Sequence, residues 1–289
     1  MIFDGRQLAN KILEEIKKET NLWPQKPSVA VVSFGAKKDN SSYIIQKRKT
    51  AESLGFGFKH YHYSKDDFSK ARVYLNKIVK MENVSAVVVQ MPLPAEINTS
   101  ILNVIPPEKD PDLLSDRSVG MFFNEHSLVN PPTAEAILDI LKEENISLSG
   151  KKIALLGYGR LVGRFLVPML IKEGATVSII DKNTPKEQVK QISLGSDIVI
   201  SAVGEANLIK GDMLKSGAVV IDAGFSILDP ALAGKGGVDG KIVGDVDLDS
   251  VKDKISLITP VPGGVGPITV ARLFSNVAKL FKYSTKFKN

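Results

Sequence analysis

Tyr43 and Lys47 are two side chains whose types and spacing could carry out proton transfer. The run that holds them has no proline or glycine before Gly55, so on a helix the two side chains stack one turn apart on the same face. A partly desolvated amine can lose its charge, and a neighbouring phenol can orient it or pass a proton. A lone Tyr-x-x-x-Lys pair is more often a solvated helix face, so the chemistry depends on what surrounds it.

The surrounding pattern predicts a parallel sheet. Short apolar runs rich in β-branched residues alternate with amphipathic stretches, and this alternation is typical of right-handed β-α-β crossovers. Ligands in such sheets bind beyond the carboxyl ends of strands. Gln90 stands at one such end and the Tyr43 helix, with Asn40, Ser41 or Ser42 as its N-cap, follows another. Strands are expected at 28–33, 56–63 and 86–90, and helices at 1–20, 43–54 and 68–80.

A second domain is predicted around Gly157, Gly159 and Gly163. A buried strand at 152–156 leads into these glycines, a helix to residue 172 follows, and the next strand ends in Asp181. The glycine turn and helix N-terminus would hold a dinucleotide pyrophosphate, and the acid would accept hydrogen bonds from ribose hydroxyls. Further strands at 197–201, 218–222 and 242–244 would complete a doubly wound sheet, two of them ending in small residues that allow close approach of a cofactor, Ala202-Val203-Gly204 and Ala223-Gly224-Phe225.

Two loops complete this organisation. Residues 106–118 are polar and proline-rich, and Pro131-Pro132-Thr133 begins a helix that could link the domains. Residues 259–269 contain the run Pro262-Gly263-Gly264-Val265-Gly266 and lead into a closing helix at 270–281. This segment is either a stiff wall beside a flat ligand or a structural turn.

Composition narrows the class of protein. The 289 residues are 43% hydrophobic and 24% charged, which is typical of a soluble globular protein with two domains. The chain has no cysteine and only three histidines, so thiolate chemistry is excluded and no metal site is expected. The net charge of +6 is scattered, which favours an anionic small substrate over nucleic acid. Without a signal peptide pattern or a long apolar run, we expect a cytoplasmic protein with no membrane partner.

Taken together, these pieces resemble the bifunctional methylenetetrahydrofolate dehydrogenase/methenyltetrahydrofolate cyclohydrolase family (FolD). The resemblance covers nearly the whole chain, and its two most specific segments are Gln90-Met91-Pro92-Leu93-Pro94 and the 259–267 run. It also rests on Tyr43-x-x-x-Lys47-x-Lys49, Lys109-Asp110-x-Asp112, Gly150-Lys151, Val219 to Gly224 and Gly244-Asp245-Val246.

This resemblance implies two α/β domains flanking a cleft, with residues 1–130 plus 268–289 binding folate and 131–267 forming a Rossmann-type NAD(P) domain. The last helix would return to the first domain, and the protein would be a homodimer. The implied reactions oxidise 5,10-methylenetetrahydrofolate with NAD(P)⁺ and hydrolyse the product to 10-formyltetrahydrofolate, in one-carbon metabolism and purine biosynthesis. A basic protein suits the polyglutamate tail of folates.

By the same resemblance, Lys47 is the general acid/base of the hydrolysis, Tyr43 supports it and Gln90 orients or tunes it. Asp112 would hold the pterin. The implied folate-binding set is Tyr43, Lys47, Val89, Gln90, Met91, Asp112, Pro262, Gly263, Gly264, Val265 and Gly266. The implied cofactor-binding set is Gly157, Tyr158, Gly159, Arg160, Gly163, Asp181, Lys182, Val203, Gly204 and Phe225.

Some residues depart from the family pattern. Asn40 replaces a serine, and Leu113-Leu114 replaces Gly-Phe, which could reshape the pterin loop. Tyr158 removes a loop arginine, and Asp181-Lys182 replaces His-Ser. A carboxylate at that strand end repels a 2′-phosphate, so these residues lean to NAD although the family prior is NADP. Lys182 or Arg160 could still receive a phosphate, and the choice stays open.

Two alternatives remain at this level. One is another two-domain NAD(P) dehydrogenase, such as a shikimate dehydrogenase-like enzyme, against which the Pro-Gly-Gly-Val-Gly run argues. The other is a degenerate paralogue that binds folate or nucleotide without turnover, which the altered loop at Leu113 motivates.

Overall fold

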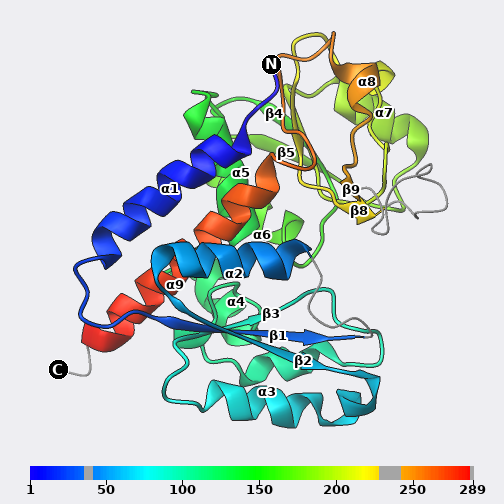
Figure 1. The fold of residues 1–289 in the computed structure, drawn as a ribbon. Coiled ribbons are helices and arrows are strands. Elements are labelled where there is room, and N and C mark those ends of the chain that lie inside the picture. Colours follow the sequence, from blue (N-terminus) through cyan, green and yellow to red (C-terminus); the bar gives the residue numbers. More distant parts are fainter. Residues whose placement is uncertain (36–41, 228–241, 287–289) are drawn as a thin grey trace, which may run out of the picture. The chain divides into compact units, whose positions relative to one another are not determined.

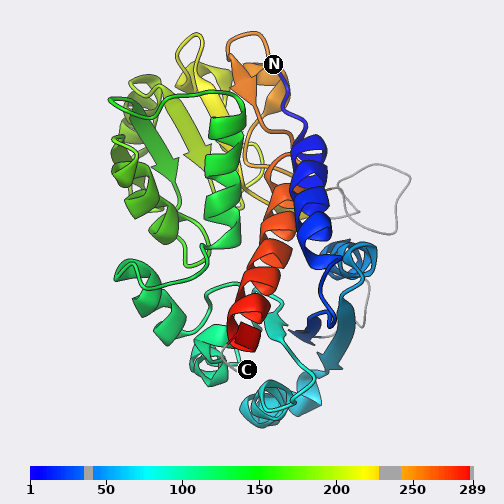
Figure 2. The same ribbon diagram turned by 90° about the vertical axis from the view of Figure 1, so that its left-hand side faces the viewer.

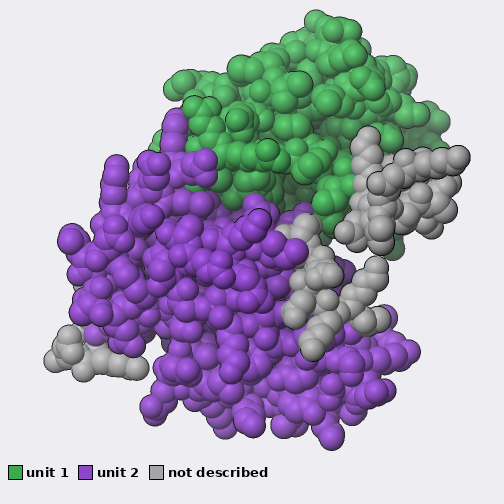
Figure 3. Space-filling view, viewed as in Figure 1, with its two compact units in different colours: residues 1–9, 133–269 green, residues 10–132, 270–289 purple. Residues whose placement is uncertain are grey.

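The structure is a computed structural model that describes residues 1–35, 42–227 and 242–286. Asn40 and Ser41, two of the three candidate caps, lie outside these ranges, and the third, Ser42, is the first residue of its helix. The chain folds into two compact units, coloured separately in Figure 3. Unit 1 comprises residues 1–9 and 133–269, and unit 2 comprises residues 10–132 and 270–289. No helix in the described part of the chain is long and apolar enough to cross a membrane.

Unit 2 is built on a three-stranded parallel sheet in the order β2-β1-β3. The strands are β1 (Ser28–Phe34), β2 (Gly57–Tyr63) and β3 (Ala86–Val89). The crossover helices α2 (Ser42–Leu54) and α3 (Ala71–Val79) cover opposite faces of this sheet (Figure 1). The expected parallel sheet is therefore confirmed, and the long apolar run of β1 is explained by burial on both faces.

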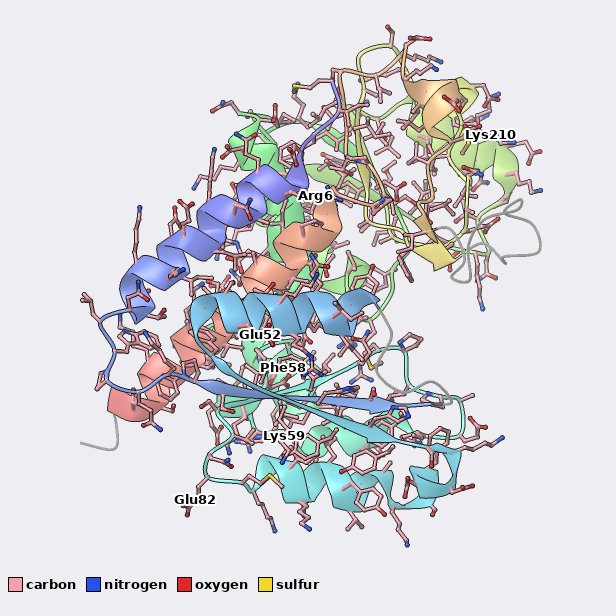
Figure 4. The ribbon with its side chains drawn as sticks, viewed as in Figure 1. Arg6, Glu52, Phe58, Lys59, Glu82 and Lys210 are labelled. Carbon is pink, nitrogen blue, oxygen red and sulfur yellow. The ribbon has the colours of Figure 1, made fainter. Side chains whose placement is uncertain are left out.

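Successive side chains of β2 point to these two faces in turn. Phe58 lies on the α2 side, where the guanidinium of Arg48 is 5.0 Å from its ring centre, and Lys59 lies on the other side (Figure 4). The expected helix at 68–80 begins instead as a 3₁₀ helix, η1 (Lys65–Lys70), which runs into α3.

The rest of unit 2 packs around this sheet. Short elements η2 (Thr99–Val104), η3 (Pro107–Lys109) and α4 (Asp116–Phe123) follow β3. The C-terminal part of α9 (Val265–Lys286) belongs to this unit, as expected for a returning last helix. Its rings pack on earlier segments, with Phe274 6.2 Å from Phe56 and Phe281 5.7 Å from Trp23, centroid to centroid.

Unit 1 contains a five-stranded parallel sheet in the order β10-β7-β6-β4-β5, which confirms a Rossmann-type domain. The order reverses direction beside β4, so the crossover helices α6 and α7 lie on opposite faces (Figures 1 and 2). The strands are β4 (Lys152–Leu156), β5 (Thr176–Ile180), β6 (Ile198–Ser201), β7 (Val219–Asp222) and β10 (Leu257–Ile258), and the helices are α5 (Pro132–Glu143), α6 (Gly163–Lys172), α7 (Lys186–Leu194) and α8 (Leu248–Val251).

The structure corrects one expected strand. Residues 242–244 do not join the main sheet: β9 (Ile242–Val243) pairs antiparallel with β8 (Ser226–Ile227) in a separate ribbon. The fifth strand of the main sheet is β10, whose two apolar residues are too short a run to read from the sequence. Likewise α9 begins at Val265 rather than 270, because Pro267 falls in the first turn, where no backbone N–H is needed.

The first nine residues lie in unit 1, whereas the sequence interpretation placed them in the other domain. The backbone explains the difference. Ile258 N donates to Met1 O at 2.9 Å and Phe3 N donates to Ile258 O at 2.8 Å, so the N-terminus extends the sheet beside β10. Helix α1 (Gly5–Thr20) then carries the chain from unit 1 into unit 2.

Candidate active site

In unit 2 the structure joins Lys47 to Gln90. Lys47 lies on α2, and its Nζ donates to Gln90 Oε1 at 2.8 Å. Gln90 follows the last residue of β3 and donates its own Nε2 to Met91 O at 3.0 Å, so the amide is held from both ends. Two residues from separate segments thus meet where the strand-end rule predicted a site.

Burial shifts the pKa values of Lys47 and of the nearby Asp112. Burial lowers the pKa of the Lys47 amine below its ordinary value, and the Asp112 carboxylate opposes part of that shift. Burial also raises the pKa of Asp112 to about 6, with Lys47 lowering it and Asp110 raising it. Within the described residues, the Asp112 carboxylate accepts no hydrogen bond, so its lone pairs are not used by the fold. An amine whose pKa is lowered by burial, next to a carboxyl whose pKa is raised by burial, forms a candidate acid–base site.

Asp110 fixes the loop that carries Asp112. Its side chain is 1% exposed and accepts from Leu114 N at 3.0 Å and Ser115 N at 2.8 Å. Leu113 between them has φ 53°, a left-handed conformation that glycine adopts more easily. Leu113 can keep this left-handed conformation because Asp110 bonds the two residues that follow it and because its own side chain is buried.

The other predicted residues of unit 2 surround this pair. Tyr43 is half-buried one turn before Lys47, and burial raises the pKa of its phenol, so it stays protonated at neutral pH. Val89 is buried at the end of β3, and Met91 packs against the core below it. The structure therefore gathers the unit 2 part of the predicted folate set around one strand end.

In unit 1 the predicted cofactor residues line up along the carboxyl edge of the sheet. Leu156 pairs with Ile180 on β5 and with Ser201 on β6, and Ser201 pairs with Asp222 on β7. The segments that follow these paired residues are therefore neighbours. In order along the edge they are Asp181-Lys182, Gly157 to Gly163, Val203-Gly204, and Phe225.

The glycine turn fits a dinucleotide phosphate. Gly157 has φ 95°, and a Cβ at Gly163 would lie 2.1 Å from Gly157 O, so the helix N-terminus packs directly on the turn. Tyr158 and Gly159 are exposed and Arg160 is half-buried. An open turn at a helix N-terminus is the arrangement that binds pyrophosphate.

Asp181 is exposed, and its position is fixed. Its Oδ1 accepts from Asn183 N at 2.9 Å, and its backbone N donates to Thr184 Oγ1 at 3.1 Å. Lys182 is exposed beside it. A carboxylate held at the end of the second strand can receive ribose hydroxyls.

The predicted wall at Pro262 to Gly266 lies in unit 1, so it shares a unit with the cofactor residues. Gly5 N donates to Gly263 O at 3.0 Å, and a Cβ at Gly5 would lie 1.9 Å from Gly264 O. The segment forms a turn that packs on the first residues of α1 and leads into α9, and its contact with folate stays a prediction. Pro262 remains exposed.

Comparison with known proteins shows which family combines these two kinds of domain. The family model described as "Tetrahydrofolate dehydrogenase/cyclohydrolase, NAD(P)-binding domain" matches residues 131–285, and the one described as the catalytic domain of the same family matches residues 3–112. The chain belongs to the tetrahydrofolate dehydrogenase/cyclohydrolase family. The bifunctional protein FolD of Aquifex aeolicus is 39% identical, over 98% of this chain and 95% of the relative.

Solved structures of the tetrahydrofolate dehydrogenase/cyclohydrolase family share this fold. The FolD of Trypanosoma brucei, complexed with NADP cofactor and inhibitor, aligns with a TM-score of 0.91 and 32% identity over 99% of this chain and 98% of that one. A shikimate 5-dehydrogenase from Listeria monocytogenes aligns with a TM-score of only 0.51 at 11% identity, covering 91% and 96%. The second resemblance is one of fold alone, and the shikimate dehydrogenase alternative is set aside.

The sequence interpretation gave no role to several buried polar residues of this chain. Asn276 on α9 is fully buried and donates to Pro111 O at 2.9 Å and Asn130 O at 2.7 Å, which ties the Asp112 loop to the last helix. Asp222 and Asp245 stand inside motifs that were quoted for the resemblance but given no role. The only signal was an acid beside glycine after an apolar run.

Proposed function

We propose that this chain oxidises 5,10-methylenetetrahydrofolate with NAD(P)⁺ and hydrolyses the methenyl product to 10-formyltetrahydrofolate, with Lys47 as the general acid/base of the hydrolysis. The observation that carries the assignment of Lys47 is its amine, desolvated yet held on Gln90 at 2.8 Å.

The methenyl substrate is a cation, which explains why a neutral amine is needed. Burial lowers the pKa of the Lys47 amine, which favours the uncharged form, and that form can accept a proton from the attacking water. Water oxygen bonds to the methenyl carbon and gives one proton to Lys47. The bond from that carbon to N5 then breaks as N5 takes a proton back from Lys47, and the hydroxyl loses its remaining proton to solvent, which leaves the formyl C=O. Overall, one water is consumed and one proton is released.

Gln90, Asp112 and Tyr43 support this chemistry. Gln90 accepts from the amine and fixes where its nitrogen points. Asp112, with unused lone pairs and a pKa raised by burial to about 6, is ionised at neutral pH and can accept pterin N–H groups. Tyr43, kept protonated by burial, can donate a hydrogen bond but cannot act as a base.

The oxidation needs positioning more than acid–base chemistry. When bound, NAD(P)⁺ takes a hydride from the methylene carbon of the substrate. The unit 1 edge would hold it with the ribose at Asp181, the pyrophosphate at Gly157 to Gly163, and the nicotinamide half beside Val203, Gly204 and Phe225.

For the cofactor we propose a preference for NAD. The Asp181 carboxylate is exposed and fixed where a 2′-phosphate would lie, and like charges repel. Initial rates with methylenetetrahydrofolate and NAD or NADP in parallel test this. Asp181→Ser should raise the rate with NADP relative to NAD, and Glu187→Gln, on α7, is the matched control. A wild-type enzyme faster with NADP would reject the preference.

The same assay tests the function as a whole. Formation of the methenyl intermediate and its hydrolysis are followed together. Folate binding with no reduction of either cofactor would support the non-catalytic paralogue instead.

We also propose a homodimer and polyglutamylated substrates. Strand β5 is the edge of its sheet, and Ile179 on it and Ile171 on α6 are 44% and 56% exposed, so pairing with a second copy along β5 would cover them. Ile179→Lys should yield a monomer by sedimentation if this edge is the interface.

The net charge of +6 favours a lower KM for polyglutamyl than for monoglutamyl folate.

A further inference from the structure

Asp245 is a buried carboxylate that gathers the loop after β6. It is fully buried and lies outside every predicted site set. Its Oδ2 accepts from Ser201 Oγ at 2.7 Å, Val203 N at 2.9 Å and Gly204 N at 3.2 Å. Its Oδ1 accepts from Glu205 N at 2.8 Å. Three consecutive backbone N–H groups and one hydroxyl therefore stabilise a single charge.

Asp222, at the end of β7, does the same for neighbouring backbone. Its Oδ1 accepts from Gly224 N at 2.9 Å and Asp245 N at 3.1 Å, and its Oδ2 accepts from Val246 N at 2.9 Å. Asp222 thus fixes the backbone that carries Asp245, and Asp245 fixes the backbone after β6.

The two acids also interlock through glycines. A Cβ at Gly224 would lie 2.0 Å from the Asp245 carboxyl carbon, and a Cβ at Gly244 would lie 2.0 Å from Asp222 Oδ2. The Asp245 carboxylate therefore packs against Gly224, two residues after Asp222, and the Asp222 carboxylate packs against Gly244, the residue before Asp245. The segments 203–205 and 223–225 are consequently held at one fixed spacing.

We infer that Asp245 is a positioning residue for the hydride-transfer step. The segment 203–205 that it holds includes Val203 and Gly204, which are assigned above to the nicotinamide half, so this inference rests on the proposed function. Asp245 itself touches neither ligand; it sets the backbone against which the ring would lie. Because hydride transfer depends on geometry while hydrolysis at Lys47 does not need this loop, Asp245 should matter for one activity and not for the other.

Asp245→Asn tests this. The new amide presents one acceptor and one NH₂ group, and the NH₂ must face backbone N–H donors, so at least one of the bonds to Val203, Gly204 and Glu205 is lost. We expect dehydrogenase kcat/KM to fall by about 100-fold, with a higher KM for the nucleotide. The rate of hydrolysis of supplied methenyltetrahydrofolate should stay within about two-fold of wild type.

Two further measurements separate positioning from general damage. With the methylene carbon deuterated, the primary isotope effect on kcat should rise in Asp245→Asn, because poorer alignment makes hydride transfer rate-limiting. Asp197→Asn is the matched control, since Asp197 also accepts a backbone N–H, from Lys152, but at the opposite end of the same sheet. It should leave the isotope effect unchanged.

If Asp245→Asn does not fold, Ser201→Ala removes a single donor to the same carboxylate and should lower only the dehydrogenase rate, by several-fold. Equal losses in both activities, or an unchanged dehydrogenase, would overturn the inference. A wild-type protein with hydrolase but no dehydrogenase activity would instead reject the proposed function.

Discussion

Asp112 in unit 2 and Asp222 in unit 1 share a raised pKa but differ in their hydrogen bonding. Burial raises the pKa of each to about 6. The oxygens of Asp222 accept three backbone N–H groups, whereas the Asp112 carboxylate accepts none from the described residues and interacts electrostatically with Lys47.

This difference shows that a raised pKa does not by itself identify a reactive acid. The Asp222 oxygens accept hydrogen bonds from the backbone, whereas no described residue donates a hydrogen bond to the Asp112 oxygens. Hydrogen-bond satisfaction, rather than the pKa, separates a structural carboxylate from a functional one.

The largest expected effect comes from removing the Lys47 amine, which interacts electrostatically with Asp112. Lys47→Met should lower hydrolysis of methenyltetrahydrofolate by about 1,000-fold, because no other amine is hydrogen-bonded to Gln90 in the described residues. Loss of the methenyl absorbance measures this. Lys49→Met, an exposed lysine on the same helix, should keep wild-type activity. Full hydrolysis by Lys47→Met would remove Lys47 from the mechanism.

A smaller effect tests Asp112 itself. Below about pH 6 the carboxyl is protonated and above it is ionised, so wild-type affinity for folate should fall as the pH drops through 6. Asp112→Asn should raise the folate KM by about 10- to 100-fold at pH 7.5 and abolish this inflection. Asp222→Asn should keep the inflection. If the Asp222 variant loses it and the Asp112 variant retains it, the comparison is reversed.

Asp222 should instead report on stability. The native state raises its pKa above the unfolded value of about 3.9, so its contribution to stability is complete below about pH 4 and is lost as the pH rises through 6. Asp222→Asn, which disturbs three acceptor contacts, should lower the free energy of unfolding by about 1–3 kcal/mol. In urea titrations the deficit should be larger at pH 4.5 than at pH 7. A deficit that grows with pH would contradict the assigned shift.

The smallest effect concerns Leu113, which follows Asp112 in the loop that Asp110 holds through Leu114 N and Ser115 N. Leu113→Ala and Leu113→Gly both remove a buried side chain, but only glycine also relieves the left-handed backbone. The glycine variant should therefore be more stable than the alanine variant by about 1 kcal/mol, measured by urea unfolding. Equal stabilities would mean that φ 53° costs little at this position.

Much of the fold was predictable because buried parallel strands are continuous apolar runs. The strands before Gln90 and before Gly157 are of this kind, and the motifs at their ends follow directly. Strand β10 was missed because two residues make no pattern; pairing with β7, a long-range contact, defines it.

The residues of the candidate site also differ in how far the sequence could predict them. Lys47 and Gln90 could be predicted because a strand end and a helix face are local features. The roles of Asp222 and Asp245 could not, because their partners are backbone N–H groups contributed by several segments. Any residue type except proline can supply such a donor, so the sequence does not identify the donors.

The chain of unit 2 is interrupted between residues 132 and 270, and α9 supplies the missing piece. A truncated protein ending at 132 would lack Phe274 and Phe281, which cover Phe56 and Trp23. The folate-side half can therefore be made alone only as a permuted or spliced gene in which residues 270–286 are joined back by a designed linker.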